Sequence, residues 1–148
     1  MTLRVVWVGK TKNSQLANLC TDYISRIKHF LPLNIAEVKE PKAGTNAEAE
    51  KILAALDASD RVVVLDPKGQ SWSSDQLAAF VQKHMNSDSR RLTFIIGGPE
   101  GLSDKVKKRA EIQWSLSPLT FTHDLTRLIL LEQLYRALTM IRNLPYSR

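Results

Sequence analysis

Five apolar runs alternate with helical segments along the chain, and this alternation restricts its possible folds more than any other feature. The runs are rich in β-branched and aromatic residues and end at turn residues, as buried strands do. Alternating strands and helices require crossover connections, which make neighbouring strands parallel and place helices on both faces of the sheet. We therefore expect an α/β fold with a mainly parallel five-stranded sheet. The strands are expected at Leu3 to Val8, Leu33 to Lys39, Arg61 to Asp66, Arg91 to Gly97 and Ile112 to Ser117.

Helix start signals lie between these runs. Thr45 with Glu48 and Ser73 with Gln76 have the spacing of a capping box, and Ser103 is a further candidate N-cap. The sequence therefore predicts helices that begin just after Thr45, Ser73 and Ser103.

The composition is that of one globular domain, with 43% hydrophobic and 24% charged residues, so a single domain is expected over residues 1–148. No apolar run reaches the roughly 18 residues needed to span a bilayer, and the N-terminus lacks the features of a secretory signal. The chain is therefore expected to act in the cytoplasm, without a membrane.

Cys20 is the only cysteine, and His29, His84 and His123 are far apart, so neither a disulfide nor a metal centre is expected. Cys20 lies among leucines and is expected to be buried in a helix.

The net charge of +6 is concentrated toward the C-terminus, where residues 89–148 hold 10 Lys/Arg against 5 Asp/Glu. We expect this surplus beside the glycine turn and the last helix. A basic face attracts polyanions by neutralising their phosphates, although a solvated surface that aids solubility explains the same charge.

Neither the glycine motif of dinucleotide-binding domains nor that of P-loop enzymes occurs, which argues against both classes.

Three loops containing glycine or proline follow the third, fourth and fifth expected strands: LDPKGQSW, IGGPEGLS and LSPLTFTHD. In an open α/β sheet, ligands bind at the carboxyl ends of the strands, which lie on one rim. Gly97 and Gly98 leave the backbone open to close approach by a ligand. GGPEG alone is compatible with a plain turn, but three such loops on one rim favour a small-molecule site.

The last helical segment, counted from Leu125 at 100° per residue, has one apolar and one polar face. Arg127 falls in the middle of the apolar face, where a buried guanidinium needs an anionic or carbonyl partner. The alternative is that Arg127 extends to solvent. Leu125 and Ile129 fall on the polar face, which indicates either a second buried surface, such as a subunit contact, or scattered surface residues.

Taken together, the motifs VVVLDPKGQSWSS, IGGPEG, LSPLTFTHDLTRLILLEQLYRA and the terminal PYSR resemble those of small single-domain SPOUT methyltransferases. The sequence is most similar to the bacterial large-subunit ribosomal RNA pseudouridine N3-methyltransferase family, more strongly after Arg61 than before it. The resemblance implies a C-terminal segment that threads through a loop to form a deep trefoil knot, a topology that periodicity does not reveal. It also implies a homodimer that binds S-adenosylmethionine in the knotted loops and has the ribosome, through its 23S rRNA, as its partner.

The resemblance places the cofactor contacts of the family on the three rim loops. Backbone groups there would read the adenine edge, and apolar side chains would cover its faces. The positions are Leu65, Gly97, Leu116, Ser117, Pro118, Leu119, Thr120 and Phe121.

The implied reaction is transfer of the sulfonium methyl group to N3 of a pseudouridine in the helix 69 loop of 23S rRNA, on an assembled ribosome. His123 and Arg127 are the candidate catalytic residues, because a cation there would stabilise an N3 anion or hold an RNA phosphate. Tyr146 and Arg148 are candidate RNA contacts. The tail departs from the family at Ser147, where relatives have a histidine, and Ser147 cannot replace a histidine as a base. Two alternatives stay open: a SPOUT methyltransferase of another RNA such as tRNA, and a cofactor-binding protein without catalysis.

Overall fold

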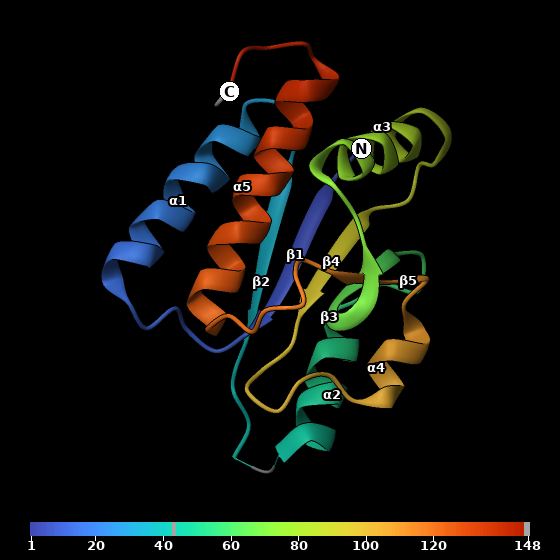
Figure 1. Ribbon diagram of the computed structural model, residues 1–148. Coiled ribbons are helices and arrows are strands. Elements are labelled where there is room, and N and C mark those ends of the chain that lie inside the picture. The colour runs from blue at the N-terminus through green and yellow to red at the C-terminus, as the bar shows by residue number, and fades with distance from the viewer. Residues whose placement is uncertain (43, 147–148) are drawn as a thin grey trace.

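Five strands form one parallel sheet in the order β2-β1-β4-β3-β5 (Figure 1). The computed structural model describes residues 1–42 and 44–146. Both β2 and β4 pair with β1 from their first residues, so that Leu3 lies between Leu33 and Leu92. The predicted α/β class and parallel sheet are confirmed. The strands are β1 (Leu3–Val8), β2 (Leu33–Val38), β3 (Arg61–Ser71), β4 (Leu92–Ile96) and β5 (Ile112–Ser115).

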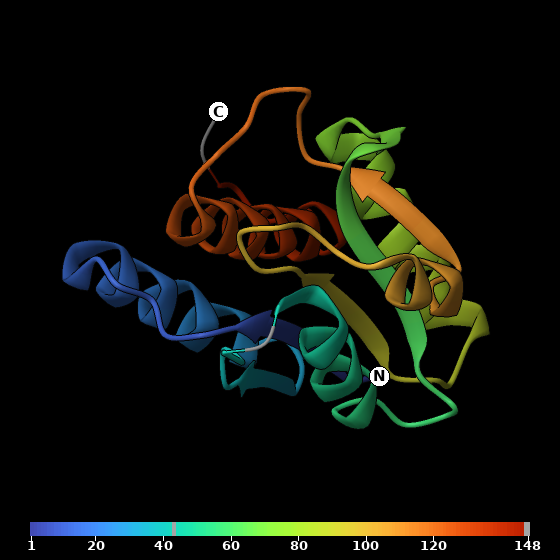
Figure 2. The ribbon, with the colours of Figure 1, turned by 90° about the horizontal axis from the view of Figure 1, so that it is seen from below.

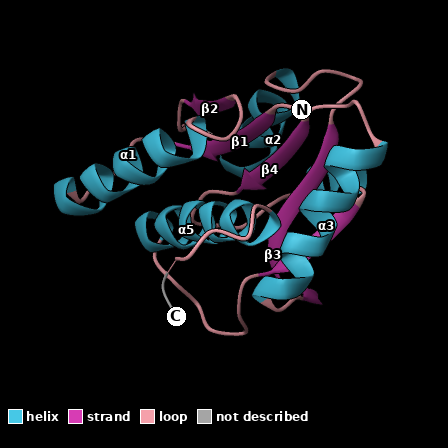
Figure 3. Ribbon diagram, turned by 90° about the horizontal axis from the view of Figure 1, so that it is seen from above, coloured by secondary structure: helices cyan, strands magenta, loops and turns pink. Residues whose placement is uncertain are grey.

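Helices cover both faces of this sheet, as the alternation predicts (Figures 2 and 3). Successive residues of a strand point to opposite faces. In β1, Val5 and Trp7 belong to the cluster packed under α1, α3 and α5, whereas Val6 and Val8 belong to the cluster under α2 and α4. Two buried faces explain why the strands read as nearly continuous apolar runs. The helices are α1 (Ser14–Lys28), α2 (Gly44–Ala54), α3 (Ser74–Ser87), α4 (Asp104–Arg109) and α5 (His123–Ile141).

The third strand is longer than expected. It was predicted to end at Asp66, but β3 continues to Ser71 and shifts its register against β5 between Leu65 and Gln70. A Cβ atom on Gly69 would lie 2.4 Å from the backbone oxygen of Gln113, so only glycine allows this close approach. LDPKGQSW is therefore an irregular strand extension rather than a loop.

Two of the three predicted helix starts are confirmed. Ser73 and Gln76 form a reciprocal capping box at α3, and the Ser103 side chain accepts the Val106 N–H at the start of α4. The prediction at Thr45 is wrong, because α2 already begins at Gly44. The carboxylate of Glu48, the expected partner of Thr45, instead accepts a hydrogen bond from the glycine turn, as described below.

Part of the C-terminal positive charge lies at the amino edge of the sheet, away from the glycine turn. Arg90 and Arg91 precede β4, and Arg90 forms ion pairs with Glu111 at 2.6 Å and with Asp88 at 2.7 Å. Arg91 pairs with the buried Asp60 at 2.8 Å. The expectation that the surplus lies beside the glycine turn is therefore wrong for these two residues.

His84 is fully buried at the same edge. Its Nε2 lies 2.8 Å from the carbonyl oxygen of Arg90, and its Nδ1 lies 3.2 Å from Nη1 of Arg61. A carbonyl only accepts and a guanidinium only donates, so Nε2 carries the proton and Nδ1 accepts. Burial lowers the pKa of His84 and, with the guanidinium groups of Arg61 and Arg90, outweighs the Arg90 carbonyl and the Asp88 carboxylate, which raise it. His84 is therefore held in the neutral form.

Candidate functional site

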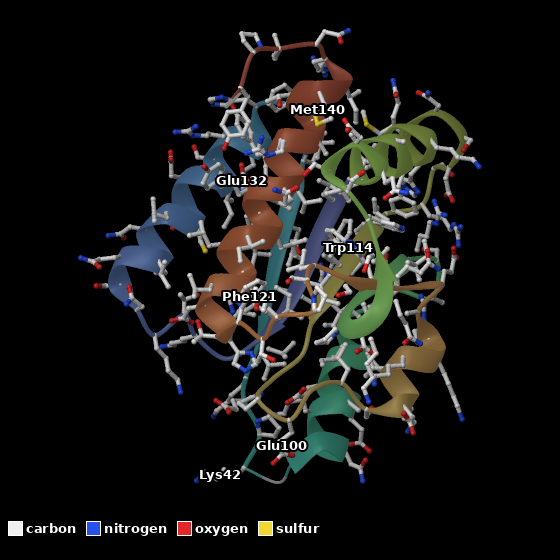
Figure 4. All side chains as sticks on the ribbon, in the orientation of Figure 1. Lys42, Glu100, Trp114, Phe121, Glu132 and Met140 are labelled. Carbon is white, nitrogen blue, oxygen red and sulfur yellow. The ribbon has the colours of Figure 1, made fainter. Side chains whose placement is uncertain are left out.

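A cavity of about 200 Å³ lies beside the irregular middle of β3 and at the carboxyl ends of β4 and β5. Its walls come from residues 65–67, from the glycine turn after β4, and from the segment that links β5 to α5. Phe121, labelled in Figure 4, lies just before α5 in that last segment. Seven of the eight positions assigned to the cofactor line this cavity, and Pro118 does not. The seven are Leu65, Gly97, Leu116, Ser117, Leu119, Thr120 and Phe121.

The glycine turn is held in place by α2. Gly98 donates its buried N–H to Oε1 of Glu48 at 3.1 Å, and Glu48 is itself buried. A Cβ atom on Gly98 would lie 2.5 Å from Oε2 of Glu48, and one on Gly97 would lie 2.8 Å from the Leu102 side chain. Gly101 closes the turn with a φ of +76° and donates to the Gly98 carbonyl at 3.0 Å. Glycine therefore suits the turn for two reasons: the positive φ at Gly101, and the lack of room for a Cβ atom beside Leu102 and Glu48 at Gly97 and Gly98.

The segment after β5 is shaped by its own serine side chains. Ser115 donates its hydroxyl to the carbonyl of Ser117 at 3.0 Å, and the Ser117 hydroxyl accepts the N–H of Leu119 at 3.0 Å. Leu119 is 69% exposed at the mouth of the cavity. An exposed leucine at a cavity mouth is suited to cover one face of a flat ligand.

Asp66 adds a negative charge to the cavity wall. Burial alone would raise the pKa of Asp66, but the Lys68 N–H at 3.0 Å and the Lys107 ammonium at 3.2 Å outweigh it and lower the pKa. Asp66 is therefore ionised at neutral pH and fixed in position by two donors. Its contribution was not predicted, although it lies within the LDPKGQSW motif.

His123 and Arg127 lie in different surroundings. His123 is the first residue of α5, after the N-cap Thr122, and it lines both this cavity and a second one beside it. Arg127 is only 2% exposed, which confirms the predicted burial and contradicts extension to solvent. Its guanidinium donates to the carbonyl of Val8 at 2.7 Å and to the hydroxyl of Thr11 at 2.9 Å. Burial lowers the pKa of Arg127.

The tail lies far from the cavity along α5. The Tyr146 hydroxyl donates to Glu132 at 2.8 Å and lies 2.9 Å from the hydroxyl of Tyr23, and the Arg136 guanidinium lies 5.0 Å from the Tyr146 ring centroid. Burial, together with these hydrogen bonds, raises the pKa of Tyr146. Figure 4 shows Glu132 midway along α5, well above Phe121. Ser147 and Arg148 lie outside the described residues, so the expected RNA contact of Arg148 stays a prediction.

The cavity suits an elongated ligand with a flat ring. Leu65, Leu116 and Leu119 offer apolar surface, while the half-buried Gly97 leaves the backbone open to close approach. No group of three His, Cys, Asp or Glu side chains in residues 1–42 and 44–146 is arranged to hold a metal ion. Over the same residues, no helix has the length and apolar character needed to cross a membrane.

Comparison with known proteins identifies the class. The sequence model of the family described as "Predicted SPOUT methyltransferase" matches residues 1–147, and the chain belongs to this family. The crystal structure of a probable methyltransferase from Bordetella pertussis Tohama I shares the fold with a TM-score of 0.55 at 12% identity, over 92% of this chain and 93% of that one. S-adenosylmethionine, the methyl donor of SPOUT methyltransferases, is accordingly the cofactor of this chain.

Individual relatives extend the similarity to the full length of the chain. The ribosomal RNA large subunit methyltransferase H of Syntrophotalea carbinolica is 42% identical over 99% of this chain and 98% of its own. The protein of the same name from Trichlorobacter lovleyi is 42% identical over 99% of both chains. The resemblance inferred from the motifs is thus confirmed.

Sequence reasoning missed the loop after β1. Lys10 and Lys12 line the second cavity together with His123 and Arg127, although more than 110 positions separate the two pairs in the chain. A signal was available, because the carboxyl end of a first parallel strand lies on the same rim as the others. The sequence of this loop, GKTKNS, matches no phosphate-binding motif, and the loop was therefore not predicted to contribute to the site.

Proposed function

We propose that the chain transfers the methyl group of S-adenosylmethionine to N3 of a pseudouridine in the helix 69 loop of 23S rRNA, on the assembled ribosome. The observation that carries the proposal is the full-length similarity to relatives named as ribosomal RNA large subunit methyltransferases. The convergence of three rim segments on one cavity supports it. Action on ribosomes also favours a cytoplasmic location.

In this proposal the cofactor occupies the cavity between Leu65, the glycine turn and the segment from Leu116 to Phe121. Pro118 does not line the cavity, and its fixed φ bends the segment that does. The apolar side chains would exclude water from the two faces of the adenine ring. The glycine turn, held in place by Glu48, would form the wall on the other side of the cofactor. The ion pair between Asp66 and Lys107 stabilises the wall formed by residues 65–67.

The cofactor supplies an activated methyl group, so the protein needs to orient the acceptor and favour loss of the N3 proton. When bound, the cofactor would supply the methyl group that N3 takes up, with S-adenosylhomocysteine as the leaving group, and the N3 proton would pass to water. His123 is the residue best placed to act on N3, because it lines both the cofactor cavity and the cavity beside it. Arg127, buried behind it, provides a positive charge that favours the N3 anion.

A homodimer accounts for the position of the tail. Tyr146 is bonded to Glu132, which lies nine residues from His123, or about 13 Å along the axis of α5. A tail that takes part in catalysis is therefore better placed to serve the cavity of a second copy. Leu125, exposed at 38% on the first turn of α5, provides apolar surface for such a contact.

The trefoil knot belongs to the same proposal. The chain leaves the edge strand β5 and returns to the middle of the sheet, where α5 packs between α1 and α3 (Figure 2). A C-terminal segment that returns from the edge strand to the middle of the sheet supports this part of the proposal.

Mass-spectrometric mapping of ribosomal RNA tests the proposal. We expect N3-methylpseudouridine in helix 69 to be absent from a strain lacking the gene and restored when the gene is returned. Incubation of the purified protein and labelled S-adenosylmethionine with ribosomes or with tRNA then identifies the acceptor. Methylation of tRNA alone would refute the ribosomal substrate, and cofactor binding by calorimetry without any methyl transfer would refute the enzyme.

A further inference from the structure

A second cavity of about 170 Å³ adjoins the cofactor cavity, and Pro99 and His123 line both. We call it the Arg127 cavity. One side is the loop after β1, and the other is the first turn of α5. Its lining residues are Val8, Gly9, Lys10, Lys12, Glu40, Pro99, Thr122, His123, Asp124 and Arg127.

Arg127 places a buried positive charge against this cavity. Its hydrogen bonds go to two neutral groups, the Val8 carbonyl and the Thr11 hydroxyl, and its guanidinium packs on the Trp7 ring at 4.8 Å. Within the described part of the chain, its Nε has no hydrogen-bond partner. A buried charge is costly unless an opposite charge balances it. An anion bound in this cavity would therefore stabilise the charge of Arg127.

The two carboxylates that act on Arg127, Asp124 and Glu37, are both bonded to other groups, and Glu37 accepts the Trp7 indole N–H at 3.1 Å. Asp124 accepts the N–H groups of Lys12 at 3.1 Å and of Asn13 at 2.8 Å, so its oxygens point to the loop after β1. These bonds fix the loop to the start of α5 and form the cavity before any ligand binds. Glu40 also lines the cavity, and its Oε2 would lie 3.4 Å from a Cβ on Gly9, on the loop side.

Two exposed lysines complete a basic mouth. Lys10 and Lys12 lie on the loop, and the 19-residue α5 begins at the cavity with its N-terminal N–H groups. Lysine ammonium groups are suited to phosphate, and a helix N-terminus favours negative charge. Arg127 lies behind them as a third positive charge.

We propose that the Arg127 cavity binds a phosphate group of the RNA strand that carries the methyl-accepting nucleotide. The inference rests on the proposed function, because the shared His123 brings a nucleotide held in this cavity next to the cofactor. Lys10 and Lys12 bind the phosphate at the mouth, and the charge of Arg127 attracts it from within. The cavity thus aligns the acceptor base with the methyl group.

The test compares two double variants that change the net charge equally. Lys10→Ala/Lys12→Ala removes the two ammonium groups at the mouth, and Lys28→Ala/Lys83→Ala removes two exposed lysines on α1 and α3. The first variant should raise the KM for ribosomes at least tenfold and leave the Kd for S-adenosylmethionine within twofold of the parent. The slope of log K against log salt for ribosome binding should fall by roughly 0.7, the value for one single-strand phosphate contact.

Equal KM values and equal salt slopes for the two double variants would overturn the inference. A loss of cofactor affinity as large as the loss of ribosome affinity would overturn it too, because it would indicate general damage.

A binding measurement keeps the inference separate from the proposed function. Uridine 5′-monophosphate and uridine are titrated into the parent and into the Lys10→Ala/Lys12→Ala variant, and binding is followed by NMR shifts of the backbone amides at positions 9 and 12. We expect the parent to prefer the monophosphate at least fivefold and the variant to lose this preference. A parent without the preference would overturn the phosphate site even if ribosomes were methylated. A parent that shows it but methylates no ribosome would overturn only the proposed function.

Discussion

Replacement of Glu48 by alanine should loosen the glycine turn and weaken cofactor binding. Glu48 Oε1 is the acceptor for the buried Gly98 N–H at 3.1 Å, and its removal leaves that donor without a partner. A buried donor left unpaired costs about 1–3 kcal/mol. Because each 1.4 kcal/mol is a factor of ten, the equilibrium between the held turn and open alternatives changes by about 5- to 150-fold. Gly98 lines the cofactor cavity, so the Kd for S-adenosylmethionine should rise within that range.

The same contact predicts coupling between Glu48 and Gly98. In Gly98→Ala the added Cβ atom would lie 2.5 Å from Glu48 Oε2, and its other close neighbours are also Glu48 atoms. Gly98 is not among the positive-φ glycines, so alanine meets no backbone strain there. The Gly98→Ala substitution should therefore be less harmful in the Glu48→Ala background, with a coupling of about 1–3 kcal/mol in a double-mutant cycle.

Calorimetry with S-adenosylmethionine and denaturant unfolding measure both effects. Glu48→Gln keeps an oxygen acceptor and should bind the cofactor within about threefold of the parent, since 0.6 kcal/mol corresponds to that factor. Glu50→Ala is the matched control, because Glu50 is exposed on the same helix. If Glu48→Ala and Glu50→Ala bind the cofactor equally well, α2 does not hold the turn in the way that we describe.

Two further substitutions test the cavity and the opposite edge of the sheet. Gly97→Ala would place a Cβ atom 2.8 Å from the Leu102 side chain, and overpacking of this kind costs about 1–3 kcal/mol. Calorimetry should therefore show a Kd for S-adenosylmethionine at least fivefold higher than that of the parent. An unchanged Kd would mean that the cofactor does not use this turn. His84 has a folded-state pKa below its ordinary 6.5, so the unfolded chain takes up a proton first as the pH falls, and the free energy of unfolding should decrease below about pH 6.5. His84→Gln should remove this decrease between pH 7 and 5 in urea unfolding curves, and a variant with the parental pH dependence would contradict the burial of a neutral His84.

The sequence predicted the strands well because their apolar runs are local and continuous. It failed at the end of β3, where the chain continues past Pro67 only because Gly69 lets it approach Gln113 of β5. It also failed at Thr45, since the expected capping partner Glu48 found a donor on another element. Both differences come from contacts between residues that are distant in the chain, which local patterns do not record.

For the candidate site, motifs located the three rim segments, and folding brought seven of the eight assigned positions to one cavity. Their role in cofactor binding stays a prediction. The burial of Arg127 and a carbonyl partner were among the expectations for its place on the helix, but that the partners would be Val8 and Thr11 was not predicted. Helical periodicity indicates which side of α5 is buried, whereas the identity of the neighbours depends on the strand that packs beneath it.

The sequence by itself determined the α/β class, the order of strands and helices, the family, and the rim on which the site lies. These follow from local periodicity and short motifs, which act within one element or one loop. Only the tertiary structure decided that Lys10 and Lys12 share a cavity with His123 and Arg127, and that Arg90 and Arg91 are paired at the far edge. The physical reason is that charges act through space, and parallel pairing brings the ends of distant strands together.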